Sequence, residues 1–166
     1  MNSETIFALI VLITCILAIV LVNSNKKKKN KQFIQTLYDF AEKSNCKISE
    51  YDLWNNTLIG IDKQAHKLFF IRKYSDHTIK NEIDLVGIQK GRVINSNRIV
   101  ENGGSNHTII DKLELTFASS DFKVADTILE FYNTNRDNLV MNGELPKTEK
   151  WAAIVNENIG EINQRK

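Results

Sequence analysis

The chain has 166 residues, of which 42% are hydrophobic and 25% are charged, and its net charge is +2. These proportions are those of an ordinary globular protein and exclude wholesale disorder. The charge is unevenly distributed, because residues 1–31 hold five lysines and one glutamate while the remaining residues carry a net charge of −2. A nucleic-acid-binding domain normally presents basic residues on its own folded surface, so we expect no nucleic acid among the partners.

An uncharged apolar run of 18 residues, TIFALIVLITCILAIVLV, occupies positions 5–22. As an α-helix it is roughly 27 Å long, close to the thickness of the hydrocarbon core of a bilayer. No basic residue precedes the run and no small-residue cleavage site follows it, which favours a retained anchor over a cleaved signal peptide. The sequence therefore predicts a transmembrane helix from about Thr5 to Val22, within an anchor segment 1–23.

A lysine cluster follows the apolar run directly. Its members are Lys26, Lys27, Lys28, Lys29 and Lys31. Basic residues beside a membrane helix stay on the cytoplasmic side, so the cluster predicts a single-pass protein of the cell membrane, with the N-terminus outside and the C-terminal domain in the cytoplasm. Lysines next to an anionic leaflet also attract lipid headgroups, and these five residues are the predicted membrane-surface contact.

The cluster belongs to a predicted basic juxtamembrane segment and amphipathic helix at 24–46. Its apolar residues recur at the spacing of one helical stripe: Phe33, Ile34, Leu37, Phe40 and Ala41. Two positions for this helix remain open. It packs on the domain that follows, or it lies on the bilayer surface with the lysines at the headgroups.

The region 47–166 is predicted to form an antiparallel β domain with a C-terminal helix. Short segments rich in β-branched and aromatic residues are separated by turn residues, which is typical of a meandering antiparallel sheet. The predicted strands are 57–62, 67–73, 78–89, 92–100, 108–119 and 127–132. For 124–132 a helical pattern competes with the strand, and both interpretations stay open.

The last predicted element is an amphipathic helix that contains a tryptophan. Pro146 and Glu149 mark its first turn. Trp151, Val155 and Ile159 follow at helical spacing, so one face of this helix is apolar. We expect Trp151 to be a core residue rather than a ligand-stacking residue.

Together these elements predict an α+β fold class. It consists of an N-terminal transmembrane helix, a short helix, an antiparallel β-sheet or barrel of about six or seven strands, and a C-terminal amphipathic capping helix. The stretches IGID, KLFFIRK, KLELTF and EKWAAIV, within 48–160, resemble the pleckstrin-homology-like (PH-like) barrel. This resemblance implies two roughly orthogonal sheets, plugged at one end by a helix with a buried tryptophan. The stretches are also similar to bacterial single-pass proteins with a short N-terminal anchor, a family that brings no assigned activity.

The PH-like resemblance adds one candidate ligand site. In many pleckstrin-homology domains that bind inositol phosphates, a basic loop joins the first two strands. The corresponding connection here, 62–67, offers only Lys63 and Lys67 as phosphate-binding candidates. The resemblance therefore implies, at most, weak phosphate binding, because fold alone does not carry function.

Catalytic motifs are missing from the sequence. His66, His77 and His107 have no HExxH or other metal-ligand spacing, and no GxSxG or GxGxxG pattern occurs. Cys46 has no base paired with it in the sequence. We expect no enzyme, no catalytic residue, no metal and no cofactor.

These observations favour a non-enzymatic, membrane-tethered cytoplasmic binding or scaffold domain that engages a protein partner or a second copy of itself. The partner's identity is not encoded in any motif. One alternative is a peripheral module that senses anionic lipid headgroups through the lysine cluster. A further alternative is a small enzyme whose site is assembled from scattered Asp and His residues and Cys46.

Overall fold

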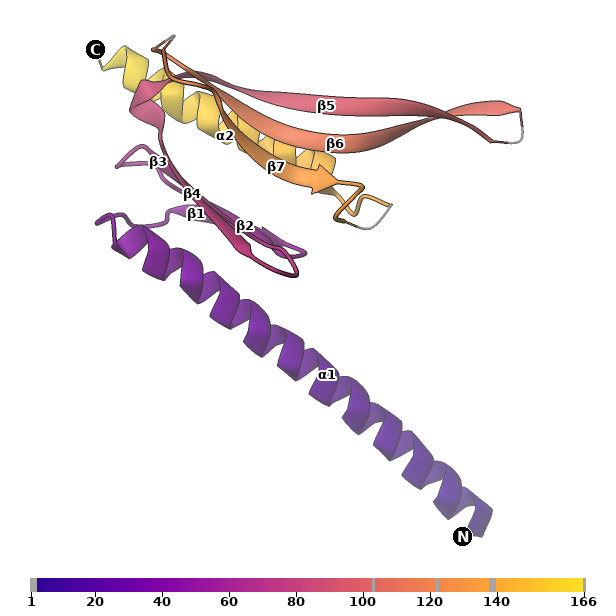
Figure 1. The fold of residues 1–166 in the computed structure, drawn as a ribbon. Helices are drawn as coiled ribbons and strands as arrows, with labels where there is room; N and C mark the ends of the chain where they lie inside the picture. The colour runs from indigo at the N-terminus through magenta and orange to yellow at the C-terminus, as the bar shows by residue number, and fades with distance from the viewer. Residues whose placement is uncertain (1–2, 103, 122, 138–139, 166) are drawn as a thin grey trace.

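The computed structural model describes residues 3–102, 104–121, 123–137 and 140–165. The described chain folds into two α-helices, one 3₁₀ helix and seven strands in two antiparallel sheets (Figure 1). The elements are α1 (Ser3–Glu42), β1 (Glu50–Trp54), β2 (Thr57–Asp62), β3 (Lys67–Lys73), β4 (Thr78–Asp84), η1 (Leu85–Gly87), β5 (Ile88–Asn102), β6 (Ser105–Ser119), β7 (Thr127–Asn133) and α2 (Glu144–Gln164).

The strands form two separate ladders in the described part of the chain. The first sheet has the order β1-β2-β3-β4 and the second the order β5-β6-β7. The C-terminal end of α1 covers the outer face of the first sheet, and the second sheet and α2 cover its inner face (Figure 1). The first sheet is therefore the middle layer of the molecule.

This middle position explains the composition of β2 and β3. A strand covered on both faces must be apolar at successive positions, not at alternate ones. Leu58, Phe69 and Ile71 pack against α1, whereas their neighbours Ile59 and Phe70 face the second sheet. The predicted strands 57–62 and 67–73 are confirmed by β2 and β3.

The main core lies between the two sheets and α2. Trp151 is fully buried there, as predicted, and its indole Nε1 donates to Asp52 Oδ2 at 2.9 Å. The same helix reaches β5, where the amide of Asn156 accepts from Gly91 N and donates to Gly91 O, both at 2.9 Å. Helix α2 thus contacts β1, which is an edge strand of the first sheet, and β5, which is an edge strand of the second.

The docking of α1 depends on a glycine in β2. A Cβ atom at Gly60 would lie 2.8 Å from Cδ2 of Leu37, a side chain that is itself fully buried. Glycine lets the helix approach the sheet more closely than any other residue would. Of the two positions considered for the amphipathic segment, packing on the domain is confirmed, since Phe33, Leu37 and Ala41 are all buried.

The transmembrane helix predicted from Thr5 to Val22 is wrong. The apolar run is not a separate element, because α1 continues from it through the lysine cluster to Glu42 as one helix of 40 residues. No helix in the described parts of the chain has both the length and the apolarity that a membrane crossing needs. Most side chains between positions 5 and 22 lie outside the described residues, and Leu12, Ile13 and Leu21, which are described, are exposed.

Three further predictions depended on that helix and are corrected with it. The first is the fold class with an N-terminal transmembrane helix and a separate short helix, which the single helix α1 replaces. The second is the single-pass membrane topology of the chain. The third is the localisation, with the N-terminus outside and the C-terminal domain in the cytoplasm, since it rested on the lysines flanking a membrane span.

Several strand boundaries also differ from the prediction. The segment 78–89 is not one strand, because the side chain of Asp84 accepts from Val86 N at 2.9 Å and starts η1. Strand β1 was not predicted at all. Strand β7 confirms the strand interpretation of 127–132, with Leu129 and Phe131 in the core.

Candidate binding groove

Three adjoining clefts open at one end of the first sheet. Their walls come from α1, the β1–β2 turn, the β3–β4 turn and the connection between β7 and α2. Their volumes are about 390, 410 and 510 Å³, and Asn56 lines all three. We call these three clefts together the Asn56 groove.

The β1–β2 turn forms the floor where the clefts meet. Asn55 adopts a left-handed backbone with φ of 44°, a conformation that asparagine tolerates better than most residues. Its Nδ2 donates to Glu144 Oε1 at 2.7 Å, and the other oxygen of Glu144 accepts from Asn142 N. Glu144 is 3% exposed and begins α2, where the helix dipole favours a negative charge.

A buried arginine holds the wall formed by β7 and the loop after it. Arg72 is 3% exposed, and its guanidinium donates to Glu130 O and to Asp137 Oδ2, both at 2.5 Å. Asp137 also accepts from Asn133 N at 2.8 Å. A buried guanidinium is tolerated only when it is paired, and here the pairing ties the β7–α2 loop to β3.

The ring of Tyr74 lies above this network and is crowded by other groups. His77 stacks on it with ring centroids 4.7 Å apart, and the guanidinium carbons of Arg72 and Arg136 each lie 5.0 Å from its centroid. The hydroxyl donates to Glu130 Oε1 at 2.9 Å. Burial raises the pKa of the Tyr74 phenol, and the bond to Glu130 adds to this rise, so the phenol remains a proton-bearing donor.

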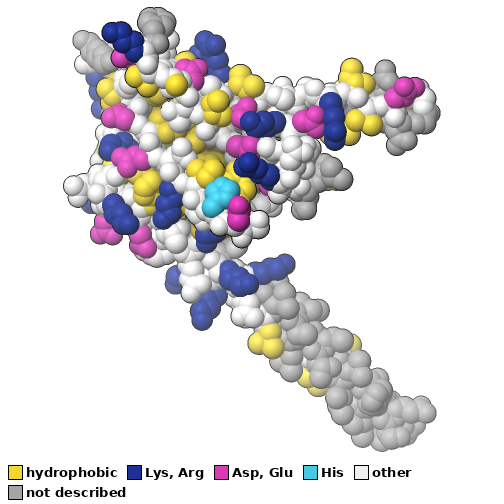
Figure 2. Space-filling view, in the orientation of Figure 1, with side chains coloured by type: hydrophobic (Ala, Val, Ile, Leu, Met, Phe, Trp, Pro, Cys, Tyr) yellow, Lys and Arg dark blue, Asp and Glu magenta, His cyan; other side chains and the backbone are white. Residues whose placement is uncertain are grey.

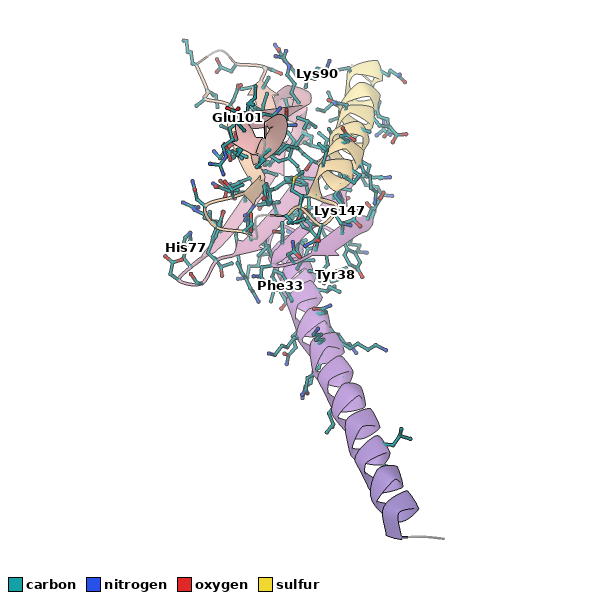
Figure 3. The ribbon with its side chains drawn as sticks, turned by 90° about the vertical axis from the view of Figure 1, so that its right-hand side faces the viewer. Phe33, Tyr38, His77, Lys90, Glu101 and Lys147 are labelled. Carbon is teal, nitrogen blue, oxygen red and sulfur yellow. The ribbon has the colours of Figure 1, made fainter. Side chains whose placement is uncertain are left out.

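His77 occupies an outward position in this arrangement. Figure 3 shows it on the β3–β4 hairpin, away from α1, whereas Phe33 lies on α1 beneath the sheet. Its Nδ1 lies 2.7 Å from Asp76 Oδ1. The histidine therefore has its partner within its own turn.

The lysine side of the groove lies on α1. Lys29 and Phe33 line the cleft together with Lys73, whose Nζ lies 4.0 Å above the ring of Phe33. Residues four and seven positions before Phe33 share its helix face, so Lys26 and Lys29 point to the groove side.

The other three lysines of the cluster, Lys27, Lys28 and Lys31, fall outside that spacing. All five lysines are exposed, and Figure 2 shows basic side chains gathered where α1 meets the body. Their contact with lipid headgroups stays a prediction.

Charged groups are unevenly distributed along the groove. Asp137 binds Arg72, and Asp76 lies beside His77. Among the described residues, no carboxylate lies within 4.0 Å of the amino groups of Lys26, Lys29 or Lys73, and Arg136 approaches Glu130 at 3.9 Å. The α1 side of the groove is therefore positively charged, since the cleft lined by Lys29 and Lys73 contains no carboxylate, whereas the clefts toward α2 hold Asp76, Asp137 and Glu144 beside Arg136.

The connection 62–67 is not the loop between the first two strands. It joins β2 to β3, because β1 precedes them, and it lies at the opposite end of the sheet from Asn56. Its two lysines are paired, Lys63 with Glu50 at 3.2 Å and Lys67 with Glu82 at 2.6 Å. Neither lysine of the connection 62–67 is therefore free to bind the phosphate that the resemblance implies.

The remaining sequence candidates are used structurally. Cys46 is 7% exposed, burial raises the pKa of its thiol, and its Sγ donates to Ser44 O at 3.3 Å. His66 Nδ1 contacts Asn158 Oδ1 at 2.9 Å, and the side chain of His107 lies outside the described residues. Within the described chain, no three His, Cys, Asp or Glu side chains converge as a metal site would require.

Lys29 and Phe33 were named from the sequence, but most of the other residues that shape the groove were not. Arg72 is the sixth residue of KLFFIRK, where an arginine near a strand end normally faces solvent. Asn56 and Arg136 lie in turns rich in asparagine, NN and NTNRDN, which indicate loops and nothing more specific. No family model, no curated protein and no solved structure matches the chain. The resemblance to the PH-like barrel therefore stays an expectation from the sequence.

Proposed function

We propose that this chain is a non-enzymatic binding domain that engages a protein partner through the Asn56 groove. The observation that carries the proposal is that three adjoining clefts share Asn56 as a lining residue, which makes this end of the sheet concave over a larger area than a single pocket. An extended polypeptide segment fits such a surface, and pockets along it supply specificity.

The chemistry of the groove supports binding over catalysis. A general acid or base needs a proton that it can exchange with a substrate, and a nucleophile needs an activating base. Here Asp137 is held by Arg72, Glu144 accepts two hydrogen bonds, and the phenol of Tyr74 donates to Glu130. These acidic groups stabilise the walls, so the groove offers a rigid surface.

Site-specific photo-crosslinking tests the proposal. A photoreactive amino acid replaces Asn56 in the full chain, which is produced in its native cells and irradiated. The matched control places the same amino acid at Asn163, an exposed asparagine on α2. We expect discrete protein adducts from position 56, suppressed by excess unmodified chain and absent from position 163.

The mass of the adducts adds a second result. An adduct with twice the mass of the chain identifies a second copy as the protein partner, which is one form of the proposal. Position 56 giving only the adducts of position 163 would overturn the proposal.

A further inference from the structure

We infer that the segment accepted by the Asn56 groove is an extended stretch of polypeptide rich in Asp and Glu. The inference rests on the proposed function and adds the chemical class of the partner. Lys26, Lys29 and Lys73, on the α1 side of the groove, have no carboxylate within 4.0 Å among the described residues, and the cleft that Lys29 and Lys73 line contains no carboxylate.

Cationic side chains are arranged along the groove, and the lysines among them have no carboxylate within 4.0 Å in the described part of the chain, whereas Arg136 already lies 3.9 Å from Glu130. Lys29 lies at the α1 end, Lys73 lies where two clefts meet, and Arg136 lines the two clefts toward α2. Lys26 adds a charge one helical turn before Lys29. A row of cations in a concave surface attracts an acidic chain over the length of the row, and guanidinium groups bind carboxylates through two parallel hydrogen bonds.

Amide side chains between these cations suit a peptide backbone. Asn55 and Asn56 line the clefts at the β1–β2 turn, Asn135 and Asn142 line them after β7, and Asn30 lines the α1 end. Each amide offers both a donor and an acceptor, which matches the N–H and C=O groups of an extended chain. The groove therefore provides for the main chain of the ligand as well as for its acidic side chains.

The same surface is a poor match for nucleic acid. Single-stranded nucleic acid binds through bases that stack on exposed aromatic rings. The ring of Tyr74, an aromatic side chain in the groove, is already contacted by His77, Arg72 and Arg136.

The test measures the affinity of the full chain for fluorescent peptides by anisotropy. The probes are a Glu/Gly/Ser peptide of about twelve residues and two matched peptides in which Gln or Lys replaces every Glu. We expect binding of the Glu peptide only, with an affinity that falls as salt is raised, because salt screens exposed charges.

Two double variants locate the binding site on α1. Lys26→Glu with Lys29→Glu reverses two charges on the groove face, and Lys28→Glu with Lys31→Glu makes the same charge change on the other side of the helix. All four lysines are exposed, so neither variant disturbs the fold. We expect the first variant to weaken binding by about tenfold or more and the second by less than about threefold.

Several results would overturn the inference. Equal binding of the Gln and Glu peptides, or equal effects of the two double variants, would show that charge in the groove does not select the ligand. Tighter binding to an oligonucleotide or to vesicles containing phosphatidylserine than to the Glu peptide, lost in the groove-face variant, would assign the groove to those ligands instead. None of these results changes the outcome of the photo-crosslinking experiment. A wrong ligand class can therefore be distinguished from a wrong proposed function.

Discussion

At the β2–β3 end of the first sheet the polar groups bind one another, whereas at the Asn56 end several of them face solvent without a partner. In the β2–β3 turn, Asp62 accepts from Lys47 N at 2.6 Å, Gln64 N at 3.0 Å and Ala65 N at 2.9 Å. At the Asn56 end, Arg72 and Glu144 are bound as completely, but they lie below a surface on which Lys29 and Lys73 have no carboxylate within 4.0 Å among the described residues.

The two ends show that the number of charged residues does not identify a binding surface. Both ends carry lysines and carboxylates, and the difference lies in the pairing. At the β2–β3 end Lys63 and Lys67 each have a carboxylate within 4.0 Å, whereas Lys73 has none among the described residues. The predictions below test whether this difference separates structural from binding residues.

The largest loss of stability is expected when Arg72 is replaced. Replacing it with methionine keeps most of the side-chain volume but removes the guanidinium from the carbonyl of Glu130 and from Asp137, which retains only the hydrogen bond from Asn133 N. We expect a loss of about 3 kcal/mol in the free energy of unfolding, the magnitude typical of a broken buried ion pair. Urea unfolding followed by tryptophan fluorescence measures the loss. The exposed Arg92 on β5 is the control, and Arg92→Met should change stability by less than about 0.5 kcal/mol.

The second largest loss of stability is expected when Asp62 is replaced, and its size depends on pH. Burial opposes its charged form, but hydrogen bonds from three backbone N–H groups outweigh burial and lower the pKa of Asp62. Because the folded pKa lies below that of the unfolded chain, about 3.9, the stabilisation is complete above that value and disappears as pH falls through the folded pKa. Asp62→Asn should cost about 2 kcal/mol at pH 7.

Unfolding curves of wild type and Asp62→Asn between pH 7 and pH 2.5 provide the measurement. The difference in stability between the two proteins should shrink as the pH falls below about 4. A difference that stays constant over this range would show that the charge of Asp62 does not stabilise the turn.

A matched pair of asparagines gives the third comparison. Asn158 is 2% exposed, and its amide contacts His66 and donates to Lys63 O at 3.1 Å. Asn158→Ala should therefore cost about 1.5 kcal/mol, because buried polar groups lose their partners. Asn56 is exposed, so Asn56→Ala should leave the melting temperature within about 1 °C of wild type. If both variants lowered the melting temperature equally, the two ends of the first sheet would not differ in how their polar residues contribute to stability.

The smallest effects on stability are expected for single lysines. Lys67→Gln removes an exposed pair with Glu82, and Lys73→Gln removes a contact with the ring of Phe33. Each should change the free energy of unfolding by about 0.5 kcal/mol. Binding of the Glu peptide should separate them, since only Lys73 lies in the groove. A weaker affinity after Lys67→Gln would place the ligand at the wrong end of the sheet.

The elements that could be predicted from the sequence are those whose neighbours cover them in a regular pattern. Strands β2 and β3 are continuous apolar runs because both faces are buried, and α2 shows the single apolar stripe of a helix packed on one side. Strand β1 has one buried residue, Trp54, and its alternation is therefore too weak to detect. The boundary between the apolar run and the lysines was misleading, since helix α1 passes through it without a break.

The groove itself could not be predicted. Its walls come from residues 29–36, 55–56, 73–77, 132–137 and 140–144, which are brought together only by the packing of α1 and α2 on the sheets. The burial of Arg72 is likewise a property of the tertiary structure, because its acceptors on β7 and in the following loop are 58 and 65 positions away in the sequence. Local periodicity contains no information on such contacts.

Among the described side chains of α1, the buried ones are Phe33, Leu37 and Ala41, near its C-terminal end. The helix begins at Ser3 and projects away from the sheets (Figure 1). Thirty residues of α-helix measure about 45 Å, so a tilt of about 5° at the sheet displaces the start of the helix by roughly 4 Å. The position of the start of α1 therefore depends strongly on the angle at which Phe33, Leu37 and Ala41 seat the helix on the first sheet.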